Sequence, residues 1–163
     1  RLDFCLSRGA SGNRSALLVF GIGRTMEFSE LNAEERSYFD DSRLAVVKFA
    51  QSLGRLWPPA DPDEGVRTLQ LIHDAKLYDT VRYYQALSIC LGDLMSMTSP
   101  LKWIHLEHDN GGGAFLQWKE TDIALNVLIA FEKRVAAGEE IDVQNIFNGF
   151  IERAIEIEKA ELE

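Results

Sequence analysis

The chain has 163 residues, of which 46% are hydrophobic and 26% are charged. This length fits one domain of ordinary size, and the composition is typical of a folded globular protein rather than of a disordered one. Its 26 acidic and 17 basic side chains give a net charge of −9 at neutral pH. The acidity argues against nucleic acid as a partner, because binding phosphates requires a basic face.

The charge is unevenly distributed along the chain. Residues 1–26 contain four arginines and one acid, whereas residues 27–163 contain 25 acidic and 13 basic side chains, a net charge of −12. We therefore expect residues 1–26 to form a basic arm or a pair of strands, Leu2–Ser7 and Ala16–Ile22, and residues 27–163 to form a single domain.

Membrane and disulfide signals are weak. No apolar run approaches the ~20 residues that span a bilayer, so we expect no membrane association. Cys5 and Cys90 are too few for a disulfide framework, and Cys90 stands among leucines, where a buried thiol is expected. Two free thiols are typical of a reducing compartment, which predicts a cytoplasmic protein.

Apolar residues recur at helical spacing in five segments. Asn32 and Glu35 resemble a capping box that begins the first helix, Ala33–Leu53, and Gly54 follows its end. The other predicted helices are residues 64–76, a largely buried helix capped by Asp79 or Thr80 that ends before Ser99-Pro100, Leu128–Ala137 with Gly138 as its stop, and a last helix capped by Asp142.

Between the third and fourth helices the apolar period changes from 3.6 to 2. Trp103, His105 and Glu107 alternate with other residues, a glycine-rich turn follows, and Ala114–Trp118 and Asp122–Val127 are the next predicted strands. This order predicts an α+β fold in which a small antiparallel sheet packs against about five helices. The sheet is a three-stranded meander, which an N-terminal hairpin would extend.

The densest group of potential ligand residues is His105, Glu107, His108 and Asp109. A closed zinc site normally has four Cys or His ligands at recognisable spacing, and the sequence does not supply them. A polar sheet face with a hairpin turn explains the group more simply, and we expect neither a metal nor a cofactor. A metal-dependent hydrolase that uses these four residues is the alternative.

Two other features invite a structural interpretation. Asp93 lies on a mostly buried helix, where a carboxylate needs an amide, an arginine or a hydroxyl as partner, and Gly92 beside it indicates close packing. Glu139, Glu140 and Asp142 precede a helix, whose dipole stabilises negative charge. The same three acids are also a candidate contact surface for a basic partner.

The order of these features resembles a bacterial family of uncharacterised domains. The features are Leu91-Gly92-Asp93-Leu94 on a helix, Leu101-Lys102-Trp103 at the start of a strand, an acid-rich hairpin, Lys133-Arg134 on a helix, and Gly138-Glu139-Glu140-Ile141-Asp142-Val143. The resemblance extends over about three quarters of the chain and excludes residues 1–26. It implies a compact α+β domain of bacterial origin, and it implies no catalytic residues. Asn126-Val127 depart from the family, which often has a proline there.

We therefore predict a non-catalytic, acidic domain that binds a basic protein, for example an immunity protein that blocks a bacterial toxin. A sensor domain with a small-ligand pocket between sheet and helices is a further alternative. Gly92, Asp93 and Gly138 are expected to be structural. The predicted partner-binding residues are Trp103, His105, Glu107, His108, Asp109, Trp118, Glu139, Glu140 and Asp142.

Overall fold

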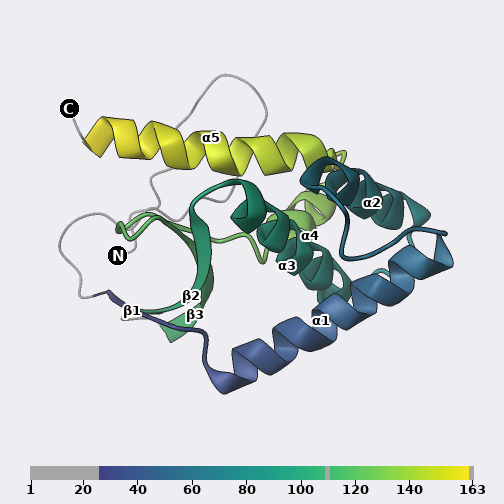
Figure 1. Ribbon diagram of the computed structural model, residues 1–163, viewed down its shortest axis with the longest axis horizontal. Coiled ribbons are helices and arrows are strands. Elements are labelled where there is room, and N and C mark those ends of the chain that lie inside the picture. The colour runs from purple at the N-terminus through teal and green to yellow at the C-terminus, as the bar shows by residue number, and fades with distance from the viewer. Residues whose placement is uncertain (1–25, 109–110, 162–163) are drawn as a thin grey trace.

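The computed structural model describes residues 26–108 and 111–161. The strand pair predicted in residues 1–26, and Cys5 with it, lie outside the described residues. Helix α3 runs through the middle of the structure between α1 and α5, and the sheet lies beside one end of these helices (Figure 1).

The five predicted helices are confirmed. Asn32 begins α1 through a capping box in which its side chain accepts from the amide of Glu35, and Thr80 caps α3. Asp142 accepts from the amide of Asn145 at the start of α5. The helices are α1 (Ala33–Ser52), α2 (Pro62–Ala75), α3 (Val81–Thr98), α4 (Ala130–Ala136) and α5 (Val143–Glu161).

Helix α2 begins two residues earlier than the sequence predicted, and the reason is local. Asp61 caps it by accepting from the amide of Glu64 at 2.8 Å, and Pro62 occupies the first turn, where its missing N–H costs no hydrogen bond. Gly138 follows α4 with φ +69, a left-handed conformation that glycine adopts without strain. The backbone therefore turns sharply between α4 and the acidic segment that precedes α5.

The sheet has four antiparallel strands, one more than predicted: β1 (Glu27–Ser29), β2 (Leu101–His108), β3 (Gly111–Trp118) and β4 (Ala124–Leu125), in that order. The predicted meander is β2–β3–β4, although β4 is shorter than Asp122–Val127. Strand β1 was not predicted, because three residues are too few to show an alternation of polar and apolar side chains. The α+β architecture is confirmed.

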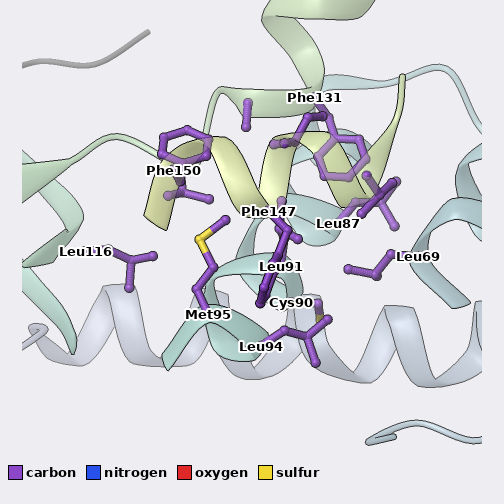
Figure 2. Close-up of a cluster of buried hydrophobic side chains, with 14 of the residues drawn as sticks. Leu69, Leu87, Cys90, Leu91, Leu94, Met95, Leu116, Phe131, Phe147 and Phe150 are labelled. Carbon is purple, nitrogen blue, oxygen red and sulfur yellow. The ribbon is translucent and has the colours of Figure 1, made fainter. Parts of the chain in front are cut away.

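The main core forms around α3, which contacts α1, α2, α4, α5 and β2. Leu87, Leu91 and Met95 of α3 are fully buried, and Phe131 of α4 and Phe150 of α5 lie against the same cluster (Figure 2). Cys90 is a buried free thiol, as expected, and its burial raises the pKa well above the usual value. None of the described helices has both the length and the apolar character to cross a bilayer.

The two faces of the sheet differ. Leu101 pairs with Trp118 and Trp103 pairs with Leu116, which places all four on the face that contributes to the main core. The opposite face carries a second buried cluster that includes Ile104, Leu106 and Phe115. Because successive side chains of a strand point to opposite faces, the face that carries Trp103 and His105 is a packing face over most of its length.

Candidate functional site

The sheet face predicted to bind a partner is mostly covered. Trp118 is only 4% exposed, and Trp103 is half-buried with its ring edge-on to Phe39 of α1 at a centroid distance of 4.8 Å. Trp118 therefore offers little surface to a partner, whereas the contribution of the half-buried Trp103 to a partner interface stays a prediction. The two indoles are covered because their apolar strand neighbours direct this face toward the helices.

The end of the same face remains polar, and His105 lies between two carboxylates there. Its Nδ1 is 2.7 Å from Oε1 of Glu35, and its Nε2 is 3.1 Å from Oε2 of Glu107. The hydrogen bond to Glu35, followed by that to Glu107, raises the pKa of His105 above its usual value. The other oxygen of Glu35 accepts from the amide of Asn32 at 2.9 Å, so the same carboxylate closes the capping box of α1 and contacts the sheet.

This arrangement does not resemble a metal centre. The two carboxylates contact opposite nitrogens of one imidazole ring, and therefore do not converge on a common point. Within residues 26–108 and 111–161, no group of three or more His, Cys, Asp or Glu residues could hold a metal ion. His108 ends β2, and Asp109 lies outside the described residues.

Asp93 has three hydrogen-bond donors around it. Arg43 of α1 binds its carboxylate with two nitrogens, Nε at 2.8 Å from Oδ2 and Nη2 at 2.9 Å from Oδ1. The indole Nε1 of Trp103 donates to Oδ1 at 3.0 Å. A Cβ on Gly92 would lie 2.2 Å from Cζ2 of that indole, so only glycine lets β2 approach α3 this closely. The group joins α1, α3 and the sheet, and its contacts are those of a structural anchor.

The segment that precedes α5, residues 138–142, is held in place by hydrogen bonds with one side chain of α2. Gln70 donates to the carbonyl of Ile141 at 2.9 Å and accepts from the amide of Val143 at 2.8 Å. Glu139 and Glu140 are exposed, and neither belongs to an ion pair among the described residues. The structure thus presents two unpaired carboxylates on a segment whose backbone is fixed.

Two acids next to Glu139 and Glu140, Asp142 and Asp74, form hydrogen bonds within the protein. Asp142 caps α5, as described above, so part of its role is local. Asp74 accepts from the same Gln70 amide group at 2.9 Å, which places a further carboxylate beside the segment. Glu139 also acts on the buried Arg134, whose pKa is lowered chiefly by burial and raised by this acid.

Sequence reasoning missed Glu35, Arg43 and Gln70. The capping-box pattern identified Glu35 as a helix-start residue, but not as the partner of a histidine 70 positions away. Arg43 and Gln70 lie 50 and 73 positions from their main partners, and no spacing rule reports such contacts. The requirement that a buried carboxylate have a partner was the one available signal, and it does not say which arginine supplies it.

The fold and site together define an α+β domain with a helix-covered antiparallel sheet and exposed acids at its polar margins. The chain belongs to the family described as "Domain of unknown function (DUF3806)", whose model matches residues 66–147. Asp93, Trp103, Glu139 and Glu140 lie inside that match, whereas Glu35 and Arg43 lie outside it.

The fold also resembles a crystal structure from Bacteroides thetaiotaomicron determined at 1.50 Å resolution. The TM-score is 0.68 and the sequence identity is 14%, over 80% of this chain and 49% of that one. This likeness supports the fold alone, and this chain spans about half the length of the solved one. No curated protein matches the chain.

Proposed function

We propose that this domain is a non-catalytic module that binds a basic protein through an acidic surface. We define the acidic loop as residues 138–142, and its exposed acids Glu139 and Glu140 carry the proposal. Because Gln70 already holds the backbone of this segment, a partner that binds there orders the two side chains but not the loop. The two acids also add to a body charge of −12 over residues 27–163, which attracts a basic partner over distances of about a Debye length.

The two sets of acids predicted from the sequence differ in their value to a partner. His105 and Glu107 already bind one another, and Glu35 occupies the second nitrogen of the ring, so a partner would have to compete with these contacts. Glu140 has no such contact, and Glu139 has only a charge interaction with the buried Arg134 and accepts no hydrogen bond through its carboxylate among the described residues. The acidic loop is therefore the better candidate interface, and His105 and Glu107 are peripheral to it.

A charge-reversal experiment tests the proposal. The double variant Glu139→Lys, Glu140→Lys should slow association with the partner at least ~10-fold at low salt and flatten its salt dependence, because steering by charge is a rate effect. Asp142 is left unchanged, since its replacement would also weaken the start of α5. The rate is measured by stopped-flow or surface-based kinetics over a series of salt concentrations.

The control is a second double reversal, Glu120→Lys, Asp122→Lys, which changes the net charge equally. Both residues are exposed, and they follow β3 beside Lys119, which pairs with Glu158 in the last turns of α5. The acidic loop precedes Val143, and Glu158 lies 15 residues further along the same helix, so the two sites are about 22 Å apart along the helix axis. Equal rates for the wild type and the acidic-loop variant would refute the proposal.

The more specific version is an immunity protein that blocks a toxin. It is supported by the acidity of residues 27–163 and by the exposed acids of the acidic loop, which together suit fast binding of a basic enzyme. Co-expression with a candidate toxin encoded by a neighbouring gene tests this version. Cells should survive with the wild-type chain and lose protection with the acidic-loop variant. Survival that is independent of this chain would exclude the toxin-inhibitor version.

A further inference from the structure

A hollow of about 250 Å³ lies between α1 and the start of α3, away from the acidic loop. It exists because small side chains face each other where the two helices pack: Ser42 and Ala45 on α1 and Ala86 on α3. Phe49 and Tyr83 add aromatic wall, with ring centroids 5.3 Å apart. The volume is below the ~300–1,000 Å³ of pockets for drug-sized molecules, so a fitting ligand is small.

One polar atom in the wall lacks a partner. Ser42 is 3% exposed, and its Oγ makes no hydrogen bond among the described residues. A buried hydroxyl without a partner is unfavourable and therefore needs an explanation. Of the other hydroxyls of the wall, Tyr83 donates to the carbonyl of Ile72 at 2.6 Å and Thr80 accepts from the amide of Tyr83 at 3.2 Å, whereas Tyr78 is 58% exposed.

The mouth of the hollow carries two opposite charges. Asp41 of α1 and Arg82 of α3 lie 3.9 Å apart, with side chains 65% and 71% exposed. An ion pair this exposed to water contributes little free energy, so a ligand can separate the two charges at little cost. Arg82 is also held over the ring of Tyr38, with its guanidinium carbon 5.8 Å from the ring centroid. The first amides of α3, which have no partner within the helix, lie beside Arg82.

From this geometry we infer that the hollow binds a free apolar α-amino acid. The carboxylate pairs with Arg82 at the positive end of α3, and the ammonium donates to Asp41. The Oγ of Ser42 is enclosed, and a change of side-chain rotamer would turn it into the hollow, where the ammonium would supply the partner that it lacks. The apolar side chain lies against Ala45, Phe49 and Ala86. An α-amino acid holds its ammonium nitrogen and carboxyl carbon about 2.5 Å apart, a spacing that suits the two opposite charges at the mouth.

This inference is independent of the proposed protein-binding function. It concerns different helices and different residues from the acidic loop, and the matched family span contains only the α3 half of the hollow. The helices α1 and α3 also hold the Asp93–Arg43 contact. A ligand between them would stabilise the folded chain in proportion to its occupancy.

The test uses the full chain with L-leucine and L-phenylalanine as probes. Titration calorimetry and the thermal midpoint should show saturable binding at millimolar concentration. Two analogues dissect the head group: 4-methylpentanoate lacks the ammonium of leucine, and 3-methylbutan-1-amine lacks its carboxylate. Each should bind about 5-fold more weakly, since a charged contact at an exposed rim is worth up to about that factor.

Variants locate the site. Arg82→Gln and Asp41→Asn change exposed rim groups and should each weaken the binding of L-leucine about 5-fold, while Ala45→Phe fills the hollow and should abolish binding. Lys48→Gln, on the exposed side of α1, is the matched charge control and should bind as the wild type does. If Ala45→Phe fails to fold, the two rim variants still decide the question.

Several results would overturn the inference. They are no binding of either probe, binding of the head-group analogues as tight as that of L-leucine, or rim variants that bind L-leucine as tightly as the wild type does. Equal binding of N-acetyl-leucine amide, which has neither charge, would also overturn it, and would indicate instead that the hollow receives an apolar side chain of a protein partner. None of these results affects the charge-reversal test of the acidic loop.

Discussion

Replacing Gly92 with alanine should destabilise the protein, although the same change stabilises most helices. Alanine is favoured over glycine by about 1 kcal/mol inside a helix. Here the added Cβ would lie 2.2 Å from Cζ2 of Trp103 and 3.0 Å from Cε2 and Cη2. Carbon atoms pack at ~3.5–4.0 Å, so the indole would have to move by more than about 1 Å.

The indole cannot move freely, because both ends of it are held. Its Nε1 donates to Asp93 at 3.0 Å, and its ring meets Phe39 edge-on at an interplanar angle of 81°. Overpacking costs ~1–3 kcal/mol, and losing a hydrogen bond to a charged group costs a similar amount. After the helix-propensity gain is subtracted, Gly92→Ala should lower the free energy of unfolding by about 2 kcal/mol.

Urea denaturation measures this change as a lower midpoint at an unchanged slope. Gly113→Ala is the matched control, since its Cβ would meet only Phe115 at 3.8 Å, an ordinary contact. The decisive comparison is Gly92→Ala in a Trp103→Phe background, where the smaller ring leaves room and the added methyl should no longer destabilise. The reasoning fails if Gly92→Ala is neutral in the wild type, or if its cost is the same in both backgrounds.

Three further predictions concern other contacts. Asp93→Asn should lower the unfolding free energy by about 1 kcal/mol in urea melts, because it leaves the half-buried Arg43 with only the exposed Asp40 as a counter-charge; an unchanged midpoint would contradict this. The pKa of His105 in the folded protein is raised above 6.5, so the stability that its charged form contributes to folding is fully present below pH 6.5. This stability is lost as the pH rises through the folded pKa. His105→Gln should therefore lower the urea midpoint more at pH 5.5 than at pH 8.5. An equal reduction at both pH values would argue against the ion pairs of His105 with Glu35 and Glu107. His73, whose pKa is lowered by burial, is present in both proteins, so its titration cancels from the comparison. Asp142→Ala should cost about 1 kcal/mol through loss of the cap on α5, whereas Asp142→Ser should restore most of the midpoint.

The sequence determined the elements of this protein more fully than their contacts. Capping residues such as Thr80 and Asp142, and the change of apolar period after Pro100, are local signals, because they depend on hydrogen bonds and side-chain directions within a few residues. They predicted five helices and the antiparallel meander. The strand β1 carries no such signal, since three residues acquire strand character only by pairing with β2.

The tertiary structure alone decided which polar residues meet and which indoles are covered. Trp103 shares one strand face with His105 and Glu107, and Ile104 and Leu106 occupy the other face, so the sequence left open which face of the sheet the helices would cover. The pairing of Glu35 with His105 and of Arg43 with Asp93 joins residues 50 or more positions apart. Such contacts depend on how amphipathic faces pack in three dimensions, and sequence spacing does not encode that packing. For the same reason the hollow at Ser42 has no signature in the sequence.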